Sequence, residues 1–117
     1  MGKTLFILND PPYGSERSYN GLRLAGSLIK RDNEAVRVFL IGDAVVCAKG
    51  GQKVPSGYYK IENMLRQIVN HESEIGVCSG CMDARGMTDE ELTRGCRRGD
   101  MEELADWTQG ADRVLIF

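Results

Sequence analysis

Four short apolar runs, separated by segments with helical periodicity, predict a parallel α/β fold. The runs cover residues 4–8, 36–41, 75–78 and 113–117. Each is continuously apolar rather than alternating, which is typical of strands that are buried on both faces of a sheet. A fifth strand near residues 95–97 is only weakly indicated by the pattern.

Apolar positions at helical spacing fall between these runs and predict three helices. The positions are Leu22, Ala25, Leu28 and Ile29; Ile61, Met64, Leu65, Ile68 and Val69; and Met101, Leu104, Ala105 and Thr108. Asp100 precedes the last set and is expected to cap its helix. Because strands and helices alternate, the chain is expected to form a parallel sheet with helices on both of its faces.

Polar and glycine-containing segments follow the first two predicted strands. Residues 9–14 form a rigid turn, and residues 49–59 contain three glycines and form a loop. Asp43 is expected to cap a short helix over residues 44–48. Sites in parallel sheets form where the strands end. The candidate pocket residues at this edge are Asn9, Tyr13, Gly14, Asp43 and Lys53.

Length and charge restrict the class of protein further. The 117 residues suffice for one domain with one core. A formal net charge of −2 without a long basic run argues against nucleic-acid binding. No apolar stretch approaches the roughly 18 residues of a membrane-spanning helix, and the N-terminal segment lacks the cleavage site of a signal peptide. A cytoplasmic protein is therefore expected, with no membrane partner.

The most distinctive chemistry of the sequence is a pair of cysteines. Cys78 ends a predicted strand and Cys81 follows three residues later. If a helical turn begins directly after Cys78, its backbone N–H groups lower the pKa of the thiol and favour the thiolate. Arg85 would add positive charge, oriented by Asp83 through a charge-assisted pair. The candidate catalytic residues are therefore Cys78, Cys81, Asp83 and Arg85.

Other interpretations of these cysteines remain open. A cysteine in a strand is often a small buried hydrophobe, and this interpretation is favoured for Cys47. A thioredoxin-like pair would normally follow an early strand, whereas this one follows the third. A zinc site would need two further ligands from Cys47, Cys96 or the single histidine, His71. Neither a metal nor a cofactor is expected.

The chain resembles the DsrE/DsrF-like proteins, and within them the YchN-like group. The string Cys78-Ser79-Gly80-Cys81-Met82-Asp83-Ala84-Arg85-Gly86 is the most specific part of the resemblance. Segments 12–16, 22–25, 39–45, 51–53 and 104–108 also match, in the same order and spacing.

This resemblance implies a three-layer α/β/α sandwich with a five-stranded parallel sheet, formed by one domain over residues 1–117. It also implies a homo-oligomer, trimeric or hexameric, with pockets at subunit contacts. Relatives in the family act in sulfur relay, in which a cysteine at the matching strand end accepts a persulfide from a donor protein and passes the sulfur to an acceptor protein. That cysteine corresponds to Cys78.

Two functions follow from these observations. The first is a sulfur-relay or thiol-redox protein, a carrier of the sulfurtransferase type. In it Cys78 is the nucleophile, Cys81 a resolving or assisting thiol, and Arg85 a stabiliser of the thiolate or persulfide. The alternative is a non-catalytic oligomeric module that binds a small ligand in a pocket between subunits, lined by residues 9–14 and 49–59.

Overall fold

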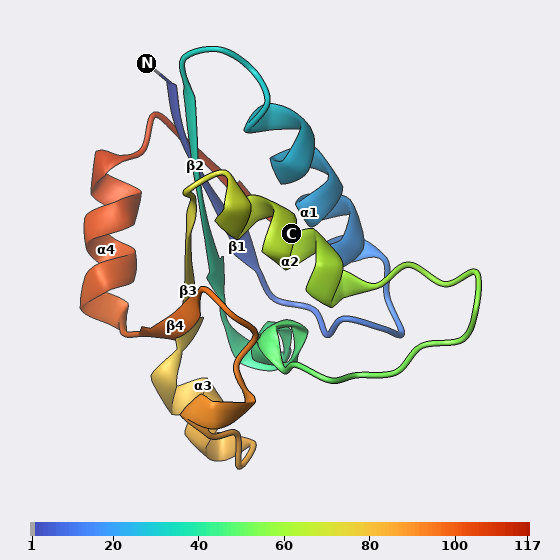
Figure 1. The fold of residues 1–117 in the computed structure, drawn as a ribbon. Coiled ribbons are helices and arrows are strands. Elements are labelled where there is room, and N and C mark those ends of the chain that lie inside the picture. The colour runs from blue at the N-terminus through green and yellow to red at the C-terminus, as the bar shows by residue number, and fades with distance from the viewer. Residues whose placement is uncertain (1) are drawn as a thin grey trace.

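Five parallel strands form the sheet at the centre of the molecule, in the order β4-β3-β2-β1-β5 (Figure 1). The structure is a computed structural model that describes residues 2–117. The strands are β1 (Gly2–Leu8), β2 (Glu34–Leu40), β3 (Glu74–Cys78), β4 (Cys96–Gly99) and β5 (Arg113–Ile116). The predicted five-stranded parallel sheet is therefore confirmed, including its weakly indicated fifth strand, which is the edge strand β4.

Helices cover both faces of the sheet and give three layers. They are α1 (Arg17–Leu28), α2 (Ile61–Asn70), α3 (Ser79–Ala84) and α4 (Met101–Gly110), with two short 3-10 helices, η1 (Gly42–Ala48) and η2 (Asp89–Glu91). Figure 1 shows α1 and α2 on one face and α4 on the other. This split follows from right-handed crossovers, because the chain moves from β1 to β4 in one direction and then crosses back to β5. Asp100 caps α4, as predicted, by accepting the Glu103 N–H at 2.9 Å.

Each face of the sheet carries its own hydrophobic cluster. The larger cluster lies under α1 and α2, and its fully buried members include Phe6, Val38 and Leu65. The smaller one lies under α4 and consists of Leu5, Phe39, Leu104 and Trp107. Full burial of each such side chain contributes about 1.5–3 kcal/mol.

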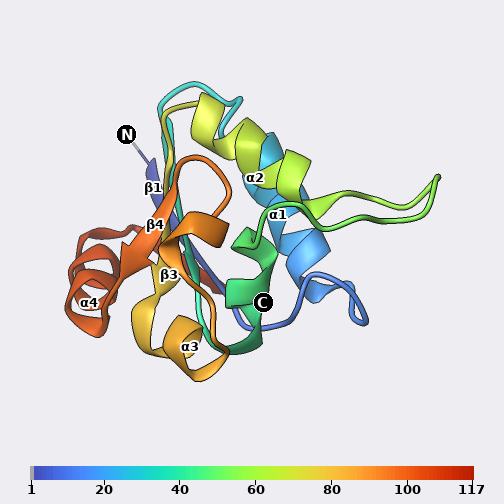
Figure 2. The same cartoon turned by 60° about the horizontal axis from the view of Figure 1, so that its bottom comes forward.

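The carboxyl ends of the strands meet α3 and η1, which pack against each other (Figure 2). The segment between η1 and α2 projects from the body of the molecule. The N-cap of η1 is Ile41, and Asp43 is the second residue inside this helix. The predicted capping role of Asp43 is therefore wrong. No helix among residues 2–117 is both long and apolar enough to cross a membrane.

Candidate functional site

Cys78 and Cys81 lie at the carboxyl end of β3, and the sulfur of each accepts a backbone N–H at the start of a helix. Cys78 is the N-cap of α3, and its Sγ accepts the Cys81 N–H at 3.3 Å. The Sγ of Cys81 in turn accepts the N–H of Gly42, the first residue of η1, at 3.2 Å. Gly42 has a φ of 60°, in the left-handed region that glycine adopts without steric cost. Both thiols are free and half-buried.

The environment of Cys78 favours the protonated thiol. Burial raises the pKa of Cys78, because its sulfur packs against both hydrophobic clusters. The neighbouring Cys81 thiol raises it further, and the N–H groups of Cys81 and Gly80 lower it only in part. The expectation of a lowered pKa is therefore wrong for Cys78. The helical turn after the strand is present, but α3 has only six residues and its effect is outweighed by desolvation.

Arg85 interacts with η1 rather than with Asp83. Its Nη2 lies 2.7 Å from Asp43 Oδ1, and its Nη1 donates to the Cys81 carbonyl oxygen at 3.1 Å. The predicted Asp83–Arg85 pair is wrong because residues two positions apart do not face each other at a helical turn. Asp83 instead lies 3.1 Å from Nη1 of Arg98.

Arg98 was not singled out among the candidate site residues. In the sequence, Arg98 lies directly after the weakly indicated strand at residues 95–97, next to Arg97. Strand β4 pairs with β3 so that Arg98 lies opposite Val77 and Gly99 opposite Cys78. Only the register of the sheet therefore reveals that an arginine reaches the thiol-bearing helix.

The predicted pocket residues separate into different places. Asp43 joins the thiol site through Arg85, whereas Asn9 donates from Nδ2 to the Phe117 carbonyl oxygen at 3.2 Å. The hydroxyl of Tyr13 accepts the Ile61 N–H at 3.3 Å, and Lys53 is exposed on the projecting loop.

A cavity of about 470 Å³ joins the turn after β1 to the projecting loop. Its lining residues are Gly14, Ser15, Glu16, Gly57, Tyr58 and Tyr59. Of the five predicted pocket residues, only Gly14 lines it. The rings of Tyr19 and Tyr59 stack at 3.9 Å between centroids, and Tyr13 lies 5.6 Å from Tyr59. Aromatic contacts therefore hold the loop against the turn and against α1 within one chain.

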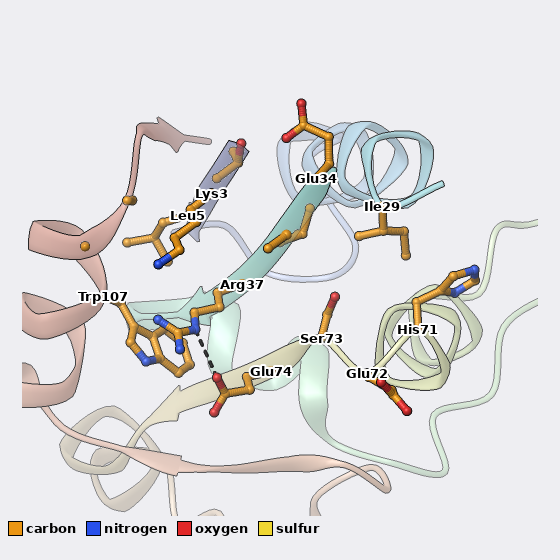
Figure 3. A pocket seen from close by; sticks show the side chains of 15 residues that line it. Lys3, Leu5, Ile29, Glu34, Arg37, His71, Glu72, Ser73, Glu74 and Trp107 are labelled. Carbon is orange, nitrogen blue, oxygen red and sulfur yellow. Dashed lines mark hydrogen bonds and ion pairs between the residues drawn. The ribbon is translucent and has the colours of Figure 1, made fainter. Parts of the chain in front are cut away.

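Another cavity, of about 350 Å³, lies at the amino ends of β1, β2 and β3 (Figure 3). It is at the opposite edge of the sheet from the thiols, and its lining includes none of the predicted site residues. Arg37 lies beside Trp107, with its guanidinium carbon 5.0 Å from the ring, and pairs with Glu74 at 3.0 Å. These contacts give this cavity a charged and aromatic wall.

The two remaining cysteines are buried in the core. Burial raises the pKa of Cys47 and of Cys96 to about 12, so both are protonated and poorly reactive at neutral pH. The structural role predicted for Cys47 agrees with this burial. Within residues 2–117, no group of three or more histidine, cysteine, aspartate or glutamate side chains is arranged to hold a metal ion.

The chain matches a known protein family over almost its whole length. The family model described as "DsrE/DsrF-like family" matches residues 2–117. Protein YchN of Escherichia coli K12 is 40% identical over 118 residues, which cover 100% of both chains. The chain belongs to the DsrE/DsrF-like family.

Solved structures agree with this assignment. The crystal structure of YchN from E. coli matches the fold with a TM-score of 0.94, at 40% identity and with 100% of both chains covered. A protein of unknown function from Methanobacterium thermoautotrophicum has a TM-score of 0.75 at 12% identity, covering 98% of this chain and 99% of its own. Among the relatives compared by sequence alone, an uncharacterized protein of Methanopyrus kandleri is 32% identical over 111 residues, which are 95% of this chain and 90% of its own. The three-layer DsrE-like fold is thereby established.

Proposed function

We propose that this DsrE/DsrF-like protein is a sulfur carrier that holds sulfur as a persulfide on Cys78. The observation that carries the proposal is the pair of half-buried free thiols at the end of β3, with the Cys78 sulfur capping α3. Family membership supports it, because relatives that act in sulfur relay use the cysteine at the matching strand end.

The transfer is a thiol exchange without net oxidation. The Cys78 thiolate attacks the outer sulfur of a donor persulfide, a new S–S bond forms, and the S–S bond of the donor breaks. The donor leaves as a thiolate and takes up the proton that Cys78 gives up. Attack of an acceptor thiolate on the outer sulfur of the Cys78 persulfide reverses these changes and restores the Cys78 thiol.

Cys81 has a separate role in the proposal. Its sulfur belongs to the same turn and can attack the inner sulfur of the Cys78 persulfide. That step releases hydrosulfide and leaves a Cys78–Cys81 disulfide, which a dithiol protein would then reduce. Asp83 and Arg85 help to hold α3 in place in this scheme. Asp83 pairs with Arg98, and the guanidinium group of Arg85 binds Asp43 and the Cys81 carbonyl oxygen.

Intact mass after incubation with a low-molecular-weight persulfide tests the proposal. The reduced protein should gain the mass of one sulfur atom, and Cys78→Ser should gain none. Cys96→Ser is the matched control, because Cys96 is buried and should not affect loading. A wild-type protein that gains no sulfur, or a Cys78→Ser variant that still gains one, contradicts the proposal.

A homo-oligomer, trimeric or hexameric, is part of the same proposal. Two large apolar side chains support it: Ile116 of the edge strand β5 is 68% exposed, and Met101 of α4 is 61% exposed. Native mass spectrometry should give three or six copies, and a monomer at micromolar concentration would contradict this part.

The second candidate function is a small-ligand-binding module. The cavity of about 470 Å³ between the turn and the projecting loop supports it. The pH dependence of thiol alkylation does not separate the two functions, because burial already raises the pKa of Cys78. Saturation-transfer NMR with a library of small metabolites separates them, because it detects ligand binding directly. If Tyr58→Ala no longer binds a ligand that the wild-type protein and Cys78→Ser both bind, the binding module is favoured.

A further inference from the structure

The side chain of Arg98 extends from the edge strand β4 to α3, the short helix that Cys78 caps. The register of the sheet places Arg98 opposite Val77, one residue before the thiol. Its side chain is only 28% exposed. The preceding residue, Arg97, turns to the other face of the sheet, with its guanidinium carbon 5.7 Å from the Trp107 ring. The two adjacent arginines therefore serve different parts of the molecule.

A single guanidinium group binds both ends of α3 and the segment that follows it. Nη1 of Arg98 donates to Ser79 Oγ at 2.7 Å and to the Ser79 carbonyl oxygen at 3.2 Å, and it lies 3.1 Å from Asp83 Oδ1. Nε pairs with Asp89, and Nη2 donates to the Met87 carbonyl oxygen at 3.4 Å. Ser79 is the first residue of α3 and Asp83 the fifth, so these contacts fix the helix along its length.

Such an external clamp has a physical reason. A helix of six residues makes too few internal hydrogen bonds to hold its own conformation. The orientation of α3 decides whether the Cys81 N–H points at the Cys78 sulfur, which it now does at 3.3 Å. The planar guanidinium group donates in several fixed directions at once, which a lysine ammonium does not reproduce.

We propose that Arg98 is a positioning residue for Cys78, which it serves by holding α3 in the orientation that directs the Cys81 N–H at the Cys78 sulfur. Its consequence for sulfur transfer rests on the proposed function. The hydrogen bond itself acts on the Cys78 thiolate whatever reaction that thiolate performs.

The test measures the pH dependence of Cys78 alkylation by iodoacetamide, followed by peptide mass spectrometry. A Cys81→Ala background removes the other half-buried thiol and keeps the backbone N–H. In this background, Arg98→Lys should raise the apparent pKa of Cys78 by about one unit and slow alkylation at neutral pH about tenfold. Arg97→Lys is the matched control and should leave the profile unchanged, because Arg97 pairs with Glu74 and Glu103.

A second variant keeps the test decisive if Arg98→Lys does not fold, as judged by circular dichroism. Ser79→Ala removes only the acceptor at 2.7 Å and should shift the profile in the same direction by a smaller amount. If each of the two variants that folds has the same alkylation profile as the Cys81→Ala parent, the positioning role is overturned. If the profiles shift as expected but the wild-type protein takes no sulfur from a persulfide, the positioning role stands and the sulfur-carrier function fails.

Discussion

Replacing Gly76 by alanine tests the packing that supports the thiol-bearing strand. Gly76 is buried in β3, two residues before Cys78. A Cβ atom at this position would lie 2.9 Å from Cδ2 of Phe39 and 3.3 Å from Cη2 of Trp107. The Phe39 ring is itself in edge contact with Trp107 at 6.0 Å and 85°, so it has little room to move. Only a residue without a side chain fits here without displacing the aromatic pair.

The size of the effect follows from two opposing contributions. Adding atoms to a filled core costs about 1–3 kcal/mol. Replacing glycine reduces the conformational entropy of the unfolded chain, which stabilises the folded protein by about 0.4–1 kcal/mol. The net expectation for Gly76→Ala is a loss of about 1–2 kcal/mol in the free energy of unfolding.

Urea unfolding, followed by the fluorescence of Trp107, measures this loss, since Trp107 is the single tryptophan of the chain. Gly80→Ala is the matched control. No heavy atom lies within 4 Å of a Cβ built there, and Gly80 lies in α3, where alanine is the better helix former. We expect Gly80→Ala to be neutral or stabilising. Equal stability of Gly76→Ala and the wild-type protein would refute the packing argument, as would equal destabilisation by both substitutions.

Two further predictions concern titration. Cys81→Ala should lower the pKa of Cys78, because the neighbouring thiol raises it, and alkylation of Cys78 at neutral pH should become faster; an unchanged or slower rate would contradict this. Burial acts to raise the pKa of Glu62, but hydrogen bonds from Thr93 and a backbone N–H lower it overall. The resulting stability is present above the unfolded pKa of about 4.3 and is lost as the pH falls through the folded pKa. Urea midpoints between pH 6 and pH 3 should therefore fall less for Glu62→Gln than for the wild-type protein. If the midpoints of the two proteins fall in parallel with pH, Glu62 does not make this contribution.

Strands β1, β2 and β3 and helices α1 and α2 were predictable because their apolar positions match their burial. The predicted face of α4 is wrong, because Met101, Ala105 and Thr108 are exposed and the helix buries Leu104 and Trp107. The predicted burial of β5 on both faces is also wrong, because β5 lies at an edge of the sheet and none of its residues is buried.

The edge strand β4 was weak in the sequence because Arg97 and Arg98 place charged groups on both of its faces. Arg97 packs over Trp107 through its guanidinium group, so a charged residue occupies a position where the pattern expects an apolar one. Hydropathy alone does not detect such a strand.

The candidate site was predictable in its thiols but not in their partners. The location of Cys78 at a strand end, followed by a helical turn, follows from the sequence. The contacts of Arg85 with Asp43 and of Arg98 with Asp83 join residues 42 and 15 positions apart, which are set by tertiary packing. The raised pKa of Cys78 has the same origin, because burial between two clusters is not visible in the local string.

Onward transfer of sulfur from the loaded protein tests the central claim most directly. The protein is loaded with a low-molecular-weight persulfide, freed of the donor, and mixed with a thiol peptide as acceptor, while the masses of both are followed. The account predicts that the protein loses one sulfur atom as the peptide gains one, and that Cys78→Ser transfers none. Sulfur that stays on the wild-type protein, or transfer by Cys78→Ser, would contradict a carrier role for Cys78.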